Sequence, residues 1–297
     1  MLGAFFIAVF PVFCIALIGY LLTRKTDVLR HPGMPILTTQ IALPALIFYS
    51  LMTKGLPVGE MLELMLVTAI CVSIGAAFVA FGCRLFKQSP CFYLSTLVNP
   101  NTGNFGIPMV FALLGEEALA TAIVISSTIT LSHFTLGITA MSGEAPWRKL
   151  FTNAPLLALV AGALLSSLEV SVPAPIMRVV ELLSGVALPV LLLLLGSSLA
   201  TLNLRRRSEL GVLALLSLYR PLSGFLIAFA VTRFAGLDSL SSLALMLQMS
   251  MPVAVMSYIL TLRYGGPSER IAALTLTSMP VSLAILAAIF AFQDLLV

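Results

Sequence analysis

Ten long apolar stretches, separated by short polar connections, constrain the fold of this chain more than any other feature of its sequence. Each is close to the roughly 20 residues that an α-helix needs to cross the hydrocarbon core of a bilayer. Charged residues make up only 9% of the chain, against about 25% in soluble domains. We therefore predict an all-α integral membrane protein with ten transmembrane helices. The predicted spans are residues 4–22, 33–53, 59–86, 90–114, 116–140, 153–169, 176–200, 209–234, 239–262 and 267–295.

The distribution of positive charge predicts an orientation. If the spans alternate in direction, twelve of the 16 Lys and Arg residues fall on one face and three on the other, and Arg220 lies within a span. Cytoplasmic loops carry the excess of positive charge, so we expect a multi-pass protein of the plasma (inner) membrane with both termini extracytoplasmic. The rich face holds Arg24, Lys25, Arg30, Arg84, Lys87, Arg148, Lys149, Arg205, Arg206, Arg207, Arg263 and Arg270, and the poor face holds Lys54, Arg178 and Arg233.

Prolines occupy corresponding positions in the two halves, which predicts an internal repeat. Pro44 in the second span corresponds to Pro189 in the seventh, and Pro100 in the fourth corresponds to Pro252 in the ninth. We expect a first five-helix repeat over 1–140, a cytoplasmic linker over 141–152 and a second repeat over 153–297. Because five is an odd number, the second repeat must be inverted. Inverted repeats with broken helices at the bilayer midplane are common in secondary transporters.

The fourth span is interrupted by polar and helix-breaking residues, Asn99-Pro-Asn-Thr-Gly-Asn-Phe-Gly-Ile-Pro108. Proline removes a backbone donor and disfavours helix at the preceding residue, so we expect unwinding here, with Asn99 as an N-cap. Backbone groups freed inside a bilayer must face protein or a water-filled cavity, and a helix N-terminus attracts anions. The alternative is a kinked helix whose amides only hold the bundle together. The candidate substrate-binding residues are Asn99, Asn101, Thr102, Gly103 and Asn104.

The ninth span has a smaller interruption, with Gln248 and Ser250 just before Pro252. Alone this is an ordinary proline kink. Paired with the fourth span by the repeat, it predicts two broken helices that cross at the midplane, with Gln248 and Ser250 as further substrate-binding candidates. Pro44 and Pro189 are predicted either to bend the second and seventh spans around this site or to serve packing alone.

Arg220 and His133 are the basic residues that the pattern places away from the ends of the spans. A charged residue near the bilayer centre costs about 2.5–3.5 kcal/mol on insertion scales and is a functional candidate by default. Arg220 could bind a substrate carboxylate, or it could only satisfy carbonyls freed by Pro221. His133 could couple protons, since imidazole titrates near neutral pH, or it could be a hydrogen-bonded core residue. No Asp or Glu falls near the centre of a predicted span, so the balance favours an anionic substrate.

The sequence contains no recognisable motif of an enzyme or of a metal site. There is no phosphate-binding loop of the P-loop type, no nucleophile elbow, and no Cys and His spacing typical of a metal site. We therefore expect no enzymatic activity, no cofactor, no metal and no nucleic-acid partner. The expected partners are the lipid bilayer, a small carboxylate and, as candidate coupling ion, the proton. Small residues in the spans would also permit a homodimer.

The segment Asn99–Pro108 resembles the helix 4 motif of the auxin efflux carrier family, which includes the plant PIN carriers and many bacterial transporters. The resemblance extends over nearly the whole chain in length, number of spans and the positions of Pro44 and Pro252. It implies a fold like that of the bile acid:sodium symporters, in which helices 4 and 9 cross at their prolines. It also implies a scaffold of helices 1, 2, 6 and 7, a transport domain of helices 3–5 and 8–10, and elevator-like motion.

The same resemblance implies a carboxylate substrate, such as auxin, malate or malonate, bound beside Asn99, Asn101, Thr102 and Asn104. The chain lacks the long cytoplasmic loop of many plant carriers, which favours the compact bacterial type. The ninth span lacks an Asn-Pro-Asn, so the two crossing helices are not equivalent. Two other functions stay open: a sodium-coupled symporter of bile-acid-type anions, and a membrane receptor that binds a ligand without transporting it.

Overall fold

A computed structural model describes residues 2–54, 56–85, 90–143, 151–201 and 210–296 of the chain. Several predictions fall on residues outside these ranges. They are residues 144–150 of the linker, residues 86 and 209 of two spans, and Lys87, Arg148, Lys149, Arg205, Arg206 and Arg207 of the positive loops. The described residues form helices joined by short connections, and they contain no β-strand beyond one isolated bridge.

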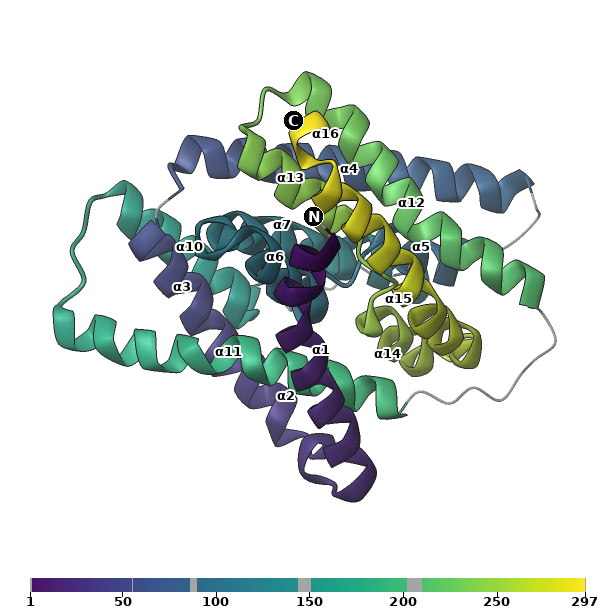
Figure 1. The fold of residues 1–297 in the computed structure, drawn as a ribbon, viewed down its shortest axis with the longest axis horizontal. Helices are drawn as coiled ribbons and strands as arrows, with labels where there is room; N and C mark the ends of the chain where they lie inside the picture. The colour runs from purple at the N-terminus through teal and green to yellow at the C-terminus, as the bar shows by residue number, and fades with distance from the viewer. Residues whose placement is uncertain (1, 55, 86–89, 144–150, 202–209, 297) are drawn as a thin grey trace.

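The helices follow the apolar stretches of the sequence (Figure 1). In the first half they are α1 (Leu2–Lys25), η1 (Val28–Arg30), α2 (Gly33–Leu37), η2 (Thr38–Ala42), α3 (Leu43–Lys54), α4 (Val58–Leu85), α5 (Pro90–Val98), η3 (Thr102–Gly106), α6 (Ile107–Leu114), η4 (Glu116–Ala118), α7 (Leu119–Ser132), η5 (His133–Gly137) and α8 (Ile138–Ser142). In the second half they are α10 (Ala154–Ser167), α11 (Ala174–Thr201), α12 (Leu210–Ala235), α13 (Ser239–Met249), α14 (Val255–Arg263), α15 (Ser268–Ala291) and α16 (Gln293–Leu296).

Seven helical stretches in the described part are long and apolar enough to cross a membrane. Three shorter apolar helices, Thr102–Leu114, Ala154–Ser167 and Ser239–Met249, lie in the fourth, sixth and ninth predicted spans. The all-helical architecture with these spans is that of an integral membrane protein, as predicted. The count of ten spans and the inversion of the second half stay predictions. The seven long stretches are Gly3–Lys25, Gly33–Thr53, Val58–Leu85, Glu116–Ser142, Ala174–Thr201, Gly211–Ala235 and Ser268–Ala291.

The helices accommodate Pro44 and Pro189 in different ways. Pro44 follows a π-helical turn, η2, which joins α2 to α3. A π-turn widens the helix locally, which makes room for a ring that would otherwise clash with a carbonyl of the preceding turn. Pro189 lies inside α11, which is one helix from Ala174 to Thr201. Whether either bend serves a binding site stays a prediction.

Two glycines allow α1 and α11 to approach each other closely. A Cβ on Gly19 would lie 2.2 Å from the backbone oxygen of Leu193, and one on Gly196 would lie 1.8 Å from that of Ala16. Glycine at such a crossing lets two helix backbones touch, as is common between membrane helices. Figure 1 shows α1 crossing α11 at this point.

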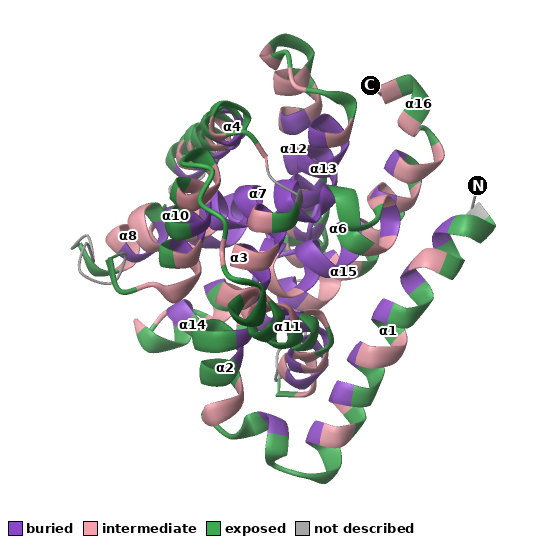
Figure 2. Ribbon diagram, turned by 90° about the vertical axis from the view of Figure 1, so that its left-hand side faces the viewer, coloured by how far each residue is buried: buried purple, intermediate pink, exposed green. Residues whose placement is uncertain are grey.

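The centre of the molecule is α7. The long stretch Glu116–Ser142 contains α7. In its most apolar segment of 18 residues, 72% of the residues are buried, against 28–33% in the corresponding segments of the other six long stretches. Figure 2 shows buried residues concentrated on α7 and α13, whereas α1 alternates buried and exposed positions along its length. The π-turn η3 before α6 and the helix α13 both pack against this central helix.

Candidate functional site

The two interrupted segments of the chain pair with each other inside the protein. After α5 ends at Val98, the backbone N–H of Asn101 donates to the carbonyl oxygen of Pro252 at 2.9 Å. Pro100 and Val253 form an isolated antiparallel bridge. The pairing satisfies backbone groups that a continuous helix would have used, as burial requires. We call these two paired segments, residues 99–101 and 250–254, the crossover.

The pairing corrects the prediction that Asn99 caps the restarting helix. Helical structure resumes only at Thr102, as the π-turn η3, and Asn101 holds the N-cap position without a side-chain capping bond. Because Pro100 and Asn101 pair with residues 252 and 253, their backbone cannot be helical. Asn99 instead ends the preceding helix, where its N–H donates to the carbonyl oxygen of Ser95 at 3.3 Å.

Serine hydroxyls of α15 complete the hydrogen bonding of the second segment. The N–H of Val253 donates to the Oγ of Ser278 at 3.0 Å, and the Oγ of Ser282 donates to the carbonyl oxygen of Ser250 at 2.6 Å. Both serines are fully buried. The sequence analysis missed them, although their spacing of four around Pro280 puts them on one helix face. They bind backbone rather than facing a ligand, so their part is to hold the crossover in place.

Asn99 and Asn101 are buried, and each has an amide nitrogen without a partner. Their side chains are 0% and 5% exposed. The Oδ1 of Asn99 accepts a bond of 2.7 Å from the Oγ of Ser132, which leaves its Nδ2 as the free end. The Nδ2 atoms of both residues lack a hydrogen-bond partner. Buried amides are normally satisfied, so two free donors two residues apart in the chain mark a place where an acceptor is missing.

The rest of the fourth-span cluster lies in η3. Thr102 is buried, and its N–H donates to the carbonyl oxygen of Pro100 at 2.9 Å. Gly103 and Asn104 are half-buried. The turn closes through a 2.9 Å bond from the N–H of Gly106 to the carbonyl oxygen of Asn101. The structure thus brings all five candidates of this cluster together at the crossover.

Gln248 and Ser250 lie at the end of α13, and each uses its donor within the protein. The Nε2 of Gln248 donates to the carbonyl oxygen of Ala122 in α7 at 3.2 Å, which leaves its Oε1 without a partner. That oxygen lies against Gly106, where a Cβ would come within 2.2 Å of it. The Oγ of Ser250 donates to the carbonyl oxygen of Met246 at 2.6 Å. Both residues therefore offer acceptors rather than donors.

Arg220 is buried in α12 beside the second interrupted segment. It is 1% exposed, and its Nε and Nη2 atoms have no partner. One turn further on, a Cβ on Gly224 would lie 1.9 Å from the backbone oxygen of Met249 and 2.6 Å from the Nη1 of Arg220. This close packing of α12 on the end of α13 places the guanidinium next to the crossover.

His133 approaches the same region from the fifth span. It begins the π-turn η5 directly after Ser132, is 7% exposed, and has a free Nδ1. In the same turn, a Cβ on Gly137 would lie 2.9 Å from the Oγ of Ser95 and 3.9 Å from the Nδ2 of Asn99. The π-turn thus packs directly on the first interrupted segment.

The charge balance of this region is positive. No Asp or Glu is buried among the described residues, whereas Arg220 is. Two ion pairs among the described residues, Arg30 with Asp27 and Arg178 with Glu181, are on the surface. A buried cation without a carboxylate is costly unless something else compensates its charge. A bound anion is one group that would supply such compensation.

Comparisons with known proteins find a family and two relatives that this chain resembles. A protein family described as "Membrane transport protein" matches the chain over residues 4–145 and 138–290. A protein of Rhizobium meliloti (strain 1021) named "Putative malonate transporter" is 27% identical over 303 residues, covering 93% of this chain and 92% of the relative. An "Uncharacterized transporter" of Methanocaldococcus jannaschii is 24% identical over 297 residues, covering 93% of this chain and 94% of the relative.

Proposed function

This chain belongs to the membrane transport protein family, and on that premise we propose that it is a secondary transporter of a small organic anion. The substrate is a mono- or dicarboxylate, such as malate, malonate or an auxin-like acid. The observation that carries this proposal is the set of buried, unpartnered donors on Asn99 and Asn101 in the crossover and on Arg220 in α12 beside it, where the described residues supply no buried carboxylate. The name of the Rhizobium meliloti relative points to malonate as the first substrate to test.

A carboxylate can use all of these donors. It accepts hydrogen bonds at two oxygens with about four lone-pair sites. The fork of an arginine matches that geometry, and such charge-assisted bonds are about twice as strong as neutral ones. We propose that Arg220 supplies the counter-charge and that Asn99 and Asn101 donate from the facing segment. Thr102, Gly103 and Asn104 shape the first side of the site, and Gln248 and Ser250 the second.

The transport cycle that we propose is alternating access of the elevator type. The scaffold consists of α1, α2–α3, α10 and α11, and the remaining helices carry the crossover. The proposal is supported by close packing within the scaffold: α1 meets α11 at Gly19 and Gly196, and a Cβ on Gly162 of α10 would lie 3.0 Å from the side chain of Leu51 in α3. Ten spans in two inverted repeats, plasma-membrane insertion with both termini extracytoplasmic, and a homodimer belong to the same proposal.

Isotope uptake into proteoliposomes tests the function directly. We expect saturable uptake of labelled malonate or malate, and competition by unlabelled carboxylates but not by their neutral amides. Uptake is then measured under an imposed proton gradient and under an imposed sodium gradient. Stimulation by the proton gradient favours proton coupling through His133, and stimulation by sodium favours the sodium-coupled bile-acid-type alternative. Binding of a carboxylate without any flux would favour the receptor alternative, and absence of both across a broad panel would overturn the proposal.

A further inference from the structure

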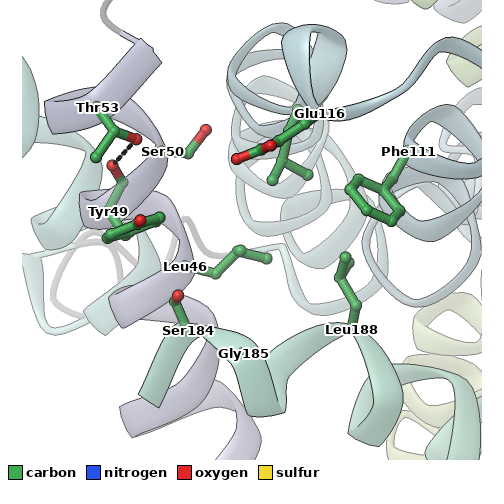
Figure 3. A pocket seen from close by; sticks show the side chains of 10 residues that line it. Leu46, Tyr49, Ser50, Thr53, Phe111, Glu116, Ser184, Gly185 and Leu188 are labelled. Carbon is green, nitrogen blue, oxygen red and sulfur yellow. Dashed lines mark hydrogen bonds between the residues drawn. The ribbon is translucent and has the colours of Figure 1, made fainter. Parts of the chain in front are cut away.

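A cavity of about 210 Å³ lies apart from the crossover, and none of the crossover residues lines it. One wall comes from α3 and α11, with Leu46, Ser50 and Leu188, and the other from α6, η4 and α7, with Phe111, Glu116 and Leu119. Figure 3 shows the cavity between these two walls. It therefore lies between two helices of the proposed scaffold and the helix that continues directly from the first interrupted segment.

Both apolar and polar side chains line the cavity. Leu46, Leu188 and Phe111 form its apolar part. In Figure 3 the carboxylate of Glu116 and the hydroxyl of Ser50 point toward each other from opposite walls. Glu116 is exposed, so it lies at the mouth of the cavity, whereas Ser50 is 2% exposed.

Ser50 carries a buried hydroxyl in the cavity wall that lacks a partner. Hydroxyls in membrane helices usually donate to a carbonyl of the preceding turn. Two other hydroxyls that line the cavity do so: Thr53 donates to the carbonyl oxygen of Tyr49, and Ser184 donates to that of Glu181. The Oγ of Ser50 has no hydrogen-bond partner. A buried hydroxyl without a bond is unfavourable, and a ligand that fills the cavity would satisfy it.

We propose that this cavity is a second ligand site, which takes a small primary ammonium ion with an apolar body. The ammonium group would donate to the carboxylate of Glu116 and to the Oγ of Ser50, and the body would contact Leu46, Leu188 and Phe111. A cavity of about 150 Å³ is large enough for benzene, so this one has room for a benzene ring with an aminomethyl group. Benzylammonium is therefore the probe of matching size and charge.

A ligand at this site would touch both walls at once. Binding itself does not depend on the proposed transport function. If the chain does transport by movement of α6 and α7 against α3 and α11, a bound ligand bridges the moving surfaces and slows the cycle. In the proposed orientation the cavity opens on the extracytoplasmic side, near the end of α3 and the start of η4. Inhibition is then expected when benzylammonium is added outside.

The test measures binding to the purified full chain in detergent at pH 7 by isothermal titration calorimetry. Benzyl alcohol and benzoate serve as neutral and anionic probes of the same shape. We expect benzylammonium to bind more tightly than both, and Ser50→Ala and Glu116→Gln each to weaken its binding by about threefold. Glu60→Gln, an exposed charge at the start of α4 outside the cavity, is the matched control and leaves binding unchanged.

A further variant fills the cavity without a backbone clash. Gly185 lines it, and a Cβ there would meet nothing within 4 Å. Gly185→Leu is expected to abolish benzylammonium binding in a protein that is at least as stable, because it replaces a helical glycine. Equal affinity for benzyl alcohol, an effect of Glu60→Gln as large as that of Glu116→Gln, or full binding to Gly185→Leu would each overturn the proposal. Absence of flux would instead count against the transport function alone.

Discussion

The backbone N–H of Asn101 and the carbonyl oxygen of Pro252 are joined by a hydrogen bond of 2.9 Å, although 150 residues separate them in the chain. This bond and the Pro100–Val253 bridge beside it hold two non-helical segments together in an otherwise helical protein. Their backbone donors and acceptors are thus largely used, and the free groups belong to side chains. The predictions below therefore concern side chains at the crossover and the glycines that let them pack.

Replacing Asn101 tests whether its free amide serves a ligand. Asn101→Ala removes an unpartnered Nδ2 and leaves the backbone bond to Pro252 in place, so we expect the unfolding temperature to stay within a few degrees of the wild type. A hydrogen bond to a charged group contributes about 1.5–3 kcal/mol, so carboxylate affinity should fall by about tenfold or more. Titration with malonate measures it. Asn101→Asp should weaken binding further by charge repulsion, and equal effects of both variants would argue against an anion.

Gly106 is predicted to leave the space that the amide end of the Gln248 side chain occupies. A Cβ at this position would lie 2.2 Å from the Oε1 of Gln248, and overpacking of this kind costs about 1–3 kcal/mol. Gly106→Ala should therefore lower the unfolding temperature, and the loss should shrink when Gln248→Ala is introduced as well. Gly103→Ala is the control, because its Cβ would lie 3.8 Å from the Oγ of Ser126, an ordinary contact. Additive losses in the double variant would contradict the assigned contact.

The sequence predicted the features that depend on residue type and local spacing. Apolar length predicted the helices, and the prolines with their neighbouring amides predicted where the fourth and ninth spans lose helical structure. The assignment of Asn99 as an N-cap was wrong because the capping rules assume a free helix end. Here Pro100 and Asn101 pair with a segment from the other half of the chain, which local reasoning cannot see.

Features that depend on packing between distant segments left no signal in the sequence. Ser278 and Ser282 look like any serines in an apolar helix, yet they satisfy the backbone of residues 253 and 250. The cavity beside Ser50 arises where α3 and α11 face α6 and α7 without filling the space between them. Neither arrangement follows from periodicity or composition, because both depend on which helices become neighbours.

Gly224 is predicted to set the distance between α12 and α13. A Cβ on it would lie 1.9 Å from the backbone oxygen of Met249, and a backbone atom cannot move aside as a flexible side chain can. Gly224→Ala should destabilise the protein by at least the roughly 1–3 kcal/mol typical of overpacking. Gly211→Ala in the same helix meets nothing within 4 Å and should be neutral or stabilising. Thermal unfolding in detergent compares the two, and similar values would disprove the close approach.

Replacing Arg220 should affect stability and function in opposite ways. Its Nε and Nη2 lack partners, and no described carboxylate is buried with it. Replacing a buried, uncompensated charge with an apolar side chain of similar length is often neutral or stabilising. Arg220→Met should therefore unfold at the same or a higher temperature while losing carboxylate binding and uptake. A residue with a purely structural role would give the opposite result, a lower unfolding temperature with the affinity of the remaining folded protein preserved.

Two further variants make the Arg220 experiment specific. Arg233→Met removes the same charge from the exposed end of the same helix and should leave uptake unchanged, which controls for net charge. Arg220→Lys keeps the charge but loses the planar fork that matches a carboxylate, so it should bind malonate more weakly than the wild type and more tightly than Arg220→Met. If Arg220→Lys and Arg220→Met behave alike, the geometry of the guanidinium matters more than its charge. If Arg233→Met matches Arg220→Met, the effect is a general one of surface potential, and Arg220 is not the counter-charge.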